Sequence, residues 1–262
     1  MCELLCGLVT RRCTVKDGSA AVTGLLLALT LPATASLWQC ALGAFFAIGI
    51  VKALFSGLGQ NLFNPALAGR ALMMLVWPVG ITRFAALGVD GVIVAPLLHH
   101  MRMPALPEES ILDLFLGNCP GCIGEISALA LLVGGAYLAW RRVISVRIPL
   151  AYLGTVAVLM LVFPKVGTPE EWMLGNLFSG GAMLGAIFMA TDYVTSSVTS
   201  RGQLIYGIGC GALTVLFRYF GLFQGGVTYA ILLMNAAAWI IDRYAIPLRA
   251  VSARRKEAAH EE

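Results

Sequence analysis

The sequence predicts an all-α integral membrane protein, a bundle of about eight transmembrane helices with an N-terminal stub. Hydrophobic residues make up 59% of the 262 residues and charged residues only 12%, which is far from the composition of a soluble domain. Apolar stretches, several close to the length that crosses a bilayer, follow one another along the chain. Basic residues gather in short loops between these stretches, as the positive-inside rule describes.

Composition also argues against several other classes. The net charge of +4 is small, and no basic patch with interleaved aromatic residues indicates nucleic-acid binding. The 7 cysteines are scattered among apolar residues, where they usually act as small hydrophobic side chains, so we expect no disulfide framework. We also expect no metal site.

The expected helices follow the apolar stretches in order. The first ten residues resemble the last turns of a span, because Arg11 and Arg12 follow the apolar run instead of preceding it as in a signal peptide. The start therefore looks truncated. Eight apolar stretches follow, at about 19–37, 39–57, 64–81, 122–140, 148–163, 176–191, 203–220 and 227–241. We expect one transmembrane domain over 1–249, with repeat halves at about 1–81 and 122–243, and a charged cytoplasmic tail at 250–262.

The loops between the stretches predict the orientation. Counting eight crossings places one set of basic residues on a single side, which the positive-inside rule makes the cytoplasm. This set is Arg11, Arg12, Lys16, Arg141, Arg142, Arg147, Arg201, Arg249, Arg254, Arg255 and Lys256. The long loop 82–121 is then extracytoplasmic, and its prolines Pro96, Pro104 and Pro107 argue against a regular helix.

A polar break, GLGQNLFNPALAGR at residues 57–70, separates two apolar stretches. It cannot face lipid, because Pro65 lacks a donor and the amide side chains need partners, so it must be buried in protein or line a wet cavity. We expect Pro65 to be the first residue of a helix capped by Asn64. Such a helix start favours an anion or an electron-rich carbonyl, although a tight turn between two spans is the simpler interpretation.

A second polar break covers residues 188–203, where Thr191 and Asp192 are followed by five hydroxyl residues and Arg201. Asp192 is tolerable there if it pairs with Arg201, and the hydroxyls can satisfy freed backbone groups. The topology places both breaks near the cytoplasmic side, so we expect them to face each other. The predicted polar site comprises Gly59, Gln60, Asn61, Asn64, Thr191 and Asp192. The alternative is a loop whose polar groups only satisfy one another.

An internal repeat accompanies the two breaks. Residues 18–24 match 179–185 in their small residues, and 43–52 match 209–218 with Lys52 and Arg218 in register. The matched elements enter the membrane from opposite sides, which indicates an inverted repeat, although convergent helix packing would also space glycines equally. Because Lys52 and Arg218 lie near helix ends, we expect both to reach toward the interface.

Two further groups could carry chemistry. Cys119 and Cys122 form a C-P-G-C sequence, which could be a redox pair or half of an iron or zinc site, but the chain has no second pair. We favour packing thiols. His99 and His100 could bind a metal in the extracytoplasmic loop, but adjacent side chains usually point apart, so we expect them to be exposed to solvent.

Three blocks carry a family resemblance over most of the chain: residues 57–70, 114–138 and 179–203. Together they resemble the D subunit of the Rnf complex, the ion-translocating ferredoxin:NAD oxidoreductase, and more distantly the B subunit of the sodium-translocating NADH:quinone reductase. The resemblance implies two inverted five-helix repeats similar to the urea-transporter fold, of which the first span and half of the second are missing here.

The resemblance also implies the function and the location. The chain would be a multi-pass subunit in the cell inner membrane, with a cytoplasmic C-terminus and other membrane and peripheral subunits as partners. The complex would couple electron transfer between ferredoxin and NAD to the translocation of sodium ions or protons. Without the family, the inverted repeat and polar breaks favour a stand-alone channel or transporter for a small polar solute.

The family carries FMN linked through its phosphate to a threonine, in a motif resembling D-G-x-S-x-A-T-P-L. This sequence reads DGVIVAPL at residues 90–97, where Asp90, Gly91 and Ala95 match the motif. Ile93 stands at the serine position, and the acceptor threonine is absent. Because no hydroxyl residue lies between Thr82 and Ser110, we expect no covalent flavin here. FMN, or riboflavin, would then bind non-covalently or come with a partner subunit.

Overall fold

The computed structural model describes residues 18–54, 61–85, 93–94, 110–221 and 226–245. The helices are α2 (Ser19–Leu29), α3 (Leu37–Phe45), the π-helix η2 (Phe46–Leu54), α4 (Pro65–Val76), α5 (Pro78–Ile81), α7 (Ile111–Leu116), α8 (Ala128–Trp140), α9 (Arg147–Val162), α10 (Pro169–Phe178), α11 (Ala182–Leu184), the π-helix η3 (Gly185–Met189), α12 (Ser200–Phe220) and α13 (Gly226–Ala245). Strands β1 (Phe84–Ala85) and β2 (Ile93–Val94) pair antiparallel, with Phe84 opposite Val94.

The structure is mostly helical, as predicted, but several helices are shorter than the apolar stretches. Residues 122–127 form a loop before α8, and the stretch 176–191 is not one helix. There α10 ends at Phe178 and α11 and η3 continue at an angle of 63°. Gly180 and Gly181 make this bend with positive φ angles of 63° and 70°, which other residues rarely adopt.

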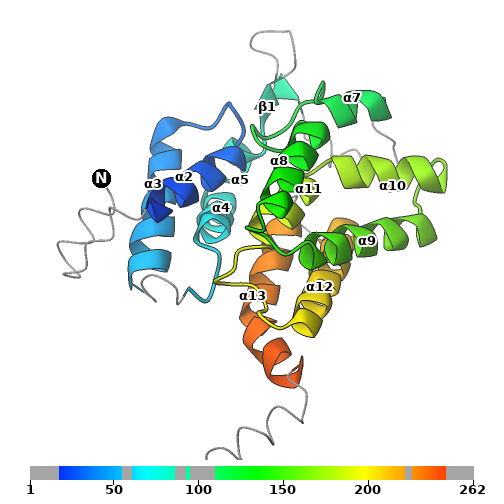
Figure 1. Ribbon diagram of the computed structural model, residues 1–262. Helices are drawn as coiled ribbons and strands as arrows, with labels where there is room; N and C mark the ends of the chain where they lie inside the picture. Colours follow the sequence, from blue (N-terminus) through cyan, green and yellow to red (C-terminus); the bar gives the residue numbers. More distant parts are fainter. Residues whose placement is uncertain (1–17, 55–60, 86–92, 95–109, 222–225, 246–262) are drawn as a thin grey trace, which may run out of the picture.

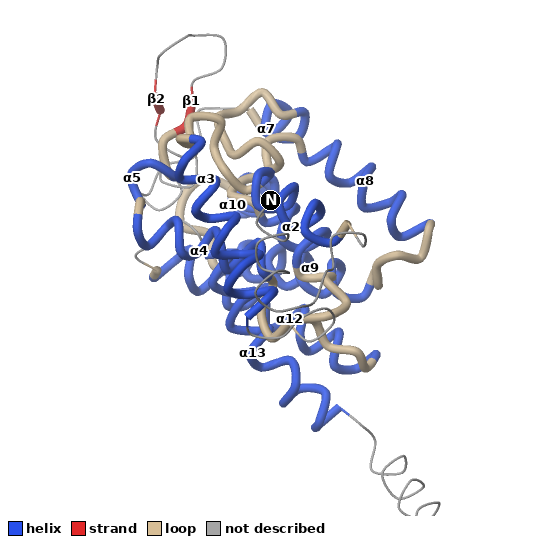
Figure 2. Tube along the Cα trace, turned by 90° about the vertical axis from the view of Figure 1, so that its left-hand side faces the viewer, coloured by secondary structure: helices blue, strands red, loops and turns tan. Residues whose placement is uncertain are grey.

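The helices form two groups. Figure 1 shows α2 to α5 (blue to cyan) on one side of the molecule and α7 to α10 (green) on the other. Helices α12 and η3 contact α9 and so join the second group. The C-terminal helix α13 contacts α4 of the first group as well as α12 and η3. The tube in Figure 2 shows how few of the described residues are strand. The helix α13 therefore joins the two groups at the place where the polar breaks lie.

Large apolar side chains lie both inside and outside the bundle. Trp172, Tyr152 and Tyr206 are fully buried, whereas Leu37, Trp140 and Phe220 are about 80% exposed or more. A soluble protein rarely leaves so much apolar surface in water, but lipid accepts it. Among the described residues, α12 is the one unbroken helix that is long and apolar enough to cross a bilayer by itself. Helix α10 and its bent continuation α11–η3 together meet the same criteria of length and composition, as a broken span or a re-entrant loop would. The number of spans stays a prediction.

The two basic residues of the repeat are buried, so the prediction that they reach the interface is wrong. Lys52 is 6% exposed and Arg218 is 7% exposed. Lys52 Nζ donates a hydrogen bond to Ser19 Oγ at 2.6 Å, at the start of α2. Arg218 donates to the carbonyl oxygens of Asn176, of Ser179 (3.0 Å) and of Gly180 (3.3 Å). The bend after α10 frees these carbonyls, and the arginine supplies the donors that they need inside a membrane.

Candidate functional site

A cavity of about 560 Å³ lies where the two polar breaks meet. Its lining includes Asn61 and Asn64 from the first break and Thr191 and Asp192 from the second. The structure therefore brings these four predicted residues together, while Gly59 and Gln60 of the predicted site lie outside the described residues. That the site binds a ligand stays a prediction. The rest of the lining is Ser19, Val22, Thr23, Leu26, Lys52, Pro65, Ala66, Leu138, Val143, Ile144, Phe188, Tyr193 and Val194.

Asn64 connects the two polar breaks by hydrogen bonds. Its Oδ1 accepts hydrogen bonds from the amides of Ala66 (3.0 Å) and Leu67 (3.3 Å), so Asn64 caps α4. Pro65 is the first residue of that helix, and both sequence predictions are confirmed. The Nδ2 of Asn64 donates to the carbonyl of Met189, the last residue of η3, at 3.4 Å. The start of α4 is therefore bonded directly to the end of η3.

Asn235 on α13 hydrogen-bonds to Asn64 at this connection, and the sequence did not lead us to predict it. Its side chain is buried, and its amide is satisfied when the oxygen accepts from the Asn64 amide at 3.1 Å. In that orientation its nitrogen donates to the Ile231 carbonyl and to the Tyr206 hydroxyl, at 3.2 and 2.6 Å. An asparagine in the middle of an apolar helix was the available signal, because such a group must find a partner inside the membrane.

Asp192 lies in the loop after η3 and bonds locally. Its carboxylate accepts from the Val194 amide at 3.3 Å and from Thr195 Oγ1 at 3.1 Å. Burial raises the pKa of Asp192, and these two hydrogen bonds only partly oppose that effect. The predicted ion pair with Arg201 is wrong: the structure describes both residues and places no ion pair between them, and Arg201 is exposed. Nearby hydroxyl and amide donors take the place of the arginine.

Asp242 near the end of α13 anchors the same loop, and the sequence analysis did not single it out. It accepts hydrogen bonds from Ser197 Oγ (2.5 Å), from the Val198 amide (3.0 Å) and from both the amide (3.1 Å) and the hydroxyl (2.8 Å) of Thr199. Thr199 Oγ1 in turn accepts from the Gly202 amide and caps α12. The hydroxyls satisfy freed backbone groups as predicted, and α13 holds the loop against the cavity.

The cavity combines a polar edge with apolar walls. Asn61 Oδ1 is a buried acceptor without a hydrogen-bond partner among the described residues. Lys52 and Asp192 add one charge of each sign, and Leu138, Ile144 and Phe188 supply apolar surface. A volume of several hundred Å³ with a few fixed polar groups is typical of a small-molecule site. Such a lining suits a flat ring system that has an N–H donor on one edge and apolar faces.

The other groups singled out in the sequence do not join this cavity. Cys119 and Cys122 are buried and form no disulfide among the described residues, consistent with packing. Within the described part of the chain, no cluster of histidine, cysteine, aspartate or glutamate could hold a metal ion. The remaining positions lie outside the described residues: His99, His100 and the motif residues Asp90, Gly91 and Ala95.

The apolar exterior, the buried basic residues and the internal cavity are those of an integral membrane protein with a partly polar cavity inside its helical domain. The chain belongs to the NQR2, RnfD, RnfE family, whose model matches residues 1–250.

Individual relatives are similar over most of their length. The chain is 47% identical over 243 residues to the D subunit of the Na⁺-translocating ferredoxin:NAD⁺ oxidoreductase complex of Acetobacterium woodii, covering 90% of this chain and 74% of the relative. It is 40% identical over 251 residues to the D subunit of the proton-translocating complex of Clostridium ljungdahlii, covering 90% and 75%. It is 38% identical over 250 residues to the B subunit of the Na⁺-translocating NADH-quinone reductase of Chromohalobacter salexigens, covering 91% and 61%.

Proposed function

We propose that this chain is the D-type membrane subunit of an Rnf-type complex, which couples electron transfer between ferredoxin and NAD to the translocation of sodium ions or protons. The observation that carries the proposal is the similarity to two D subunits of such complexes, at 47% and 40% identity over nine-tenths of the chain. The chain would hold a cofactor and the helices around it, and the cofactor would supply the redox chemistry.

Purification from native membranes tests this function against the alternative. An affinity tag on this chain should co-purify iron–sulfur and flavin subunits, and the preparation should reduce NAD with reduced ferredoxin. The alternative is a stand-alone channel or transporter for a small polar solute. If the purified chain alone gives solute uptake in liposomes and brings no redox subunits with it, the proposal is overturned.

We further propose that the cavity between the breaks binds the isoalloxazine ring of a flavin non-covalently. The free acceptor Asn61 Oδ1 would take a ring N–H, and the Asn64 amide and Lys52 would border the polar edge of the ring. Phe188 and Leu138 would cover apolar ring surface. When bound, a flavin can accept and pass on electrons; the role of these side chains is to hold the ring and keep water away from it.

Flavin content provides the test of this site. Asn61→Ala should lower the amount of flavin released when the purified complex is denatured, measured per copy of the chain. Asn118→Ala is the control, because Asn118 bonds to Asp113 in the extracytoplasmic segment away from the cavity. Equal flavin content in the two variants would mean that the polar groups of the breaks only satisfy one another.

We propose that this chain carries no covalent flavin at residues 90–97. A phosphoester requires a hydroxyl, and the two hydroxyls that flank this region are already engaged. Thr82 Oγ1 donates to the Pro78 carbonyl at 2.8 Å, and Ser110 Oγ donates to Asp113 at 2.7 Å while it caps α7. Their sequence surroundings, ITRF and EESI, also lack the alanine before and the Pro-Leu after the acceptor.

Expression together with a flavin transferase tests this absence. The chain should show no fluorescent band on a denaturing gel and no mass increase of one FMN. Replacement of Ile93→Ser together with insertion of a threonine after Ala95 should create such a band. A fluorescent band from the natural sequence would contradict the proposal.

The orientation of the chain follows the loop charges, and exposed aromatic residues support it. Trp140 is 79% exposed directly before Arg141 and Arg142, and Trp239 lies under the Arg243 guanidinium. These residues suit a cytoplasmic interface, where aromatic rings and basic side chains gather. We therefore propose that the C-terminal end of α13 faces the cytoplasm of a cell with this protein in its inner membrane. Protease cleavage of the tail in inside-out vesicles but not in intact cells would test it.

A further inference from the structure

A second and smaller cavity of about 60 Å³ lies further along α4. Arg70 and Met74 of α4 line it together with Glu125 from the loop before α8. Thr30, Thr82, Ser179 and Thr228 are among the other polar residues of the lining, and the bend at Gly180 and Gly181 also borders the cavity. The proposed flavin site shares no lining residue with this cavity.

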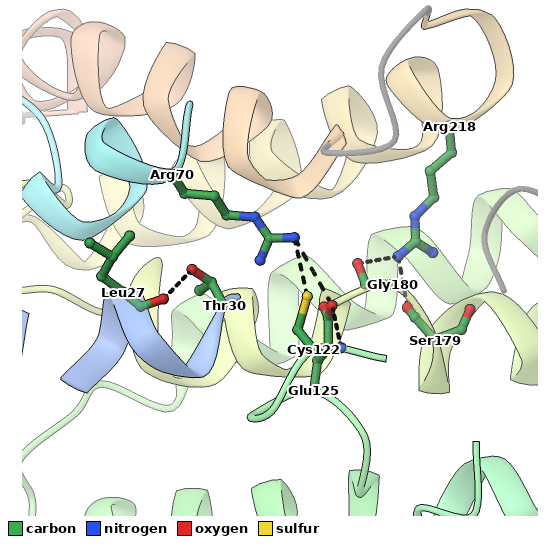
Figure 3. Close-up of polar contacts among 8 residues, drawn as sticks. All are labelled: Leu27, Thr30, Arg70, Cys122, Glu125, Ser179, Gly180 and Arg218. Carbon is green, nitrogen blue, oxygen red and sulfur yellow. Dashed lines mark hydrogen bonds and ion pairs between the residues drawn. The ribbon is translucent and has the colours of Figure 1, made fainter. Parts of the chain in front are cut away.

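Two buried charges face each other in the second cavity (Figure 3). The side chains of Arg70 and Glu125 are only 14% and 8% exposed, and Arg70 Nη2 lies 4.0 Å from Glu125 Oε1. The same nitrogen lies 3.8 Å from Cys122 Sγ, and the Cys122 amide donates to Glu125 Oε1 at 3.3 Å. The position of the carboxylate is therefore set by the loop backbone as well as by the arginine.

The backbone of α2 holds this loop in place. The amides of Ile123 and Gly124 donate to the carbonyls of Leu31 and Leu29, at 3.1 and 2.8 Å. Gly124 has no room for a side chain, because a Cβ there would lie 2.5 Å from Leu29 Cβ. The backbone from which the Glu125 side chain projects is therefore held in place against the end of α2.

Each of the two charged side chains leaves one buried atom without a hydrogen-bond partner among the described residues. These atoms are Arg70 Nε, which is a donor, and Glu125 Oε2, which is an acceptor. A buried polar atom without a partner is costly, and native proteins satisfy nearly all of them with protein groups or ordered water. The cavity therefore needs an occupant that satisfies a donor and an acceptor together.

Charge decides which occupant fits. A metal cation would satisfy Glu125 Oε2 but would be repelled by the Arg70 guanidinium, and a halide would satisfy Arg70 Nε but face the carboxylate. Water accepts from one group and donates to the other. Because one water needs roughly 10 to 15 Å³ of probe volume, the cavity has room for about four to six. We propose that this cavity is a hydrated chamber, in which ordered water bridges Arg70 Nε to Glu125 Oε2.

Methionine oxidation during X-ray footprinting tests the chamber, because hydroxyl radicals form from bound water and react with neighbouring sulfur. Met74 and Met189 line the cavity although they are only 4% and 1% exposed. Met73 and Met160, both 0% exposed and outside its lining, are matched controls in the same chain. In the purified assembly, Met74 and Met189 should oxidise several-fold faster than the controls. Equal rates would overturn the proposal.

Two variants and a change of salt sharpen this test. The double variant Arg70→Met, Glu125→Leu should lower oxidation of Met74 and Met189 to the rate of Met73, whereas Glu125→Gln should keep it high. A rate that changes when sodium replaces potassium, or when gluconate replaces chloride, would assign the cavity to an ion and contradict the proposal. If the double variant does not assemble, the oxidation rates of Met74 and Met189 relative to Met73 and Met160 in the natural chain still test the proposal. The proposal does not rest on the proposed function, since the ratio needs no ferredoxin or NAD activity.

Discussion

Lys52 and Arg218 lie in register in the predicted internal repeat but hold their neighbours differently. Both are buried, and both reach the beginning of a helix that starts with a left-handed glycine, Gly18 for α2 and Gly181 for α11. Lys52 donates to a side-chain hydroxyl, Ser19 Oγ. Arg218 donates to three main-chain carbonyls around the bend after α10.

The difference follows from the groups that each basic residue has to satisfy. An arginine presents several donors in a fixed fork, which suits a set of converging carbonyls, whereas a lysine is a compact charge on a flexible stem. Carbonyls freed at a bend inside a membrane have no water to bond. The second half therefore depends on its basic residue for the backbone itself, and the first half depends on it less.

Arg218→Met should have the largest effect on stability. Loss of the guanidinium leaves the carbonyls of Asn176, Ser179 and Gly180 without these donors. Because hydrogen bonds to charged groups contribute about 1.5 to 3 kcal/mol each, we expect a loss of more than about 3 kcal/mol and failure to assemble. Fluorescence-detected size exclusion after heating measures it. Arg218→Lys keeps the charge but not the fork of donors, so its melting temperature should lie between those of the natural chain and Arg218→Met. An unchanged melting temperature in Arg218→Met would contradict the comparison of the two basic residues.

Gly211→Ala should have the next largest effect, because α9 and α12 of the second half pack closely against each other. A Cβ on Gly211 of α12 would lie 2.7 Å from the Tyr152 carbonyl of α9, and backbone cannot yield as a flexible side chain does. We expect a loss of about 1 to 3 kcal/mol from overpacking. Gly154→Ala is the matched control, because nothing lies within 4 Å of a Cβ there. Similar melting temperatures for the two variants would contradict close packing of α9 on α12.

Lys52→Met and Ser19→Ala should each have a smaller effect of about 1.5 kcal/mol, because each change removes a single hydrogen bond to a charged group. The two losses should not add in the double variant, because both changes remove the same hydrogen bond at 2.6 Å. Ser36→Ala is the control, since Ser36 precedes α3 without a side-chain capping bond. Melting temperatures of the four chains complete the cycle. Fully additive losses would show that Lys52 and Ser19 act separately.

Local signals in the sequence predicted the start of α4 correctly. Asn64 followed by Pro65 combines a capping side chain with a residue that needs no amide hydrogen, and both act over one turn of helix. The meeting of the two breaks was also predictable, because counting crossings places them on the same side. These inferences needed only neighbouring residues and the order of the spans.

The burial and the hydrogen-bond partners of the basic residues could not be predicted from such local signals. The carbonyls that bind Arg218 become free only because α10 bends after Phe178, and the apolar run 176–191 hides that bend. Gly180 and Gly181 could equally have been small residues in a helix contact. Asn235 and Asp242 acquire their roles from α13 crossing the first break and the loop 190–199, which are distant in sequence.

The smallest effects should come from two aspartates outside the spans, whose contributions to stability depend on pH in opposite ways. Burial raises the pKa of Asp192, so its contribution is present at low pH and is lost as the pH rises through that raised value. Hydrogen bonds from Ser110 and Asn118 lower the pKa of the exposed Asp113, so its contribution is present above about pH 4 and is lost as the pH falls. Asp192→Asn should therefore gain stability relative to the natural chain as the pH rises, and Asp113→Asn should lose it. Melting temperatures from about pH 3 to about pH 8 measure both differences, each variant serving as the control for the other. If the difference in melting temperature between variant and natural chain changed with pH in the same direction for both variants, burial would not be raising the pKa of Asp192. That result would contradict the predicted difference between the buried and the exposed carboxylate.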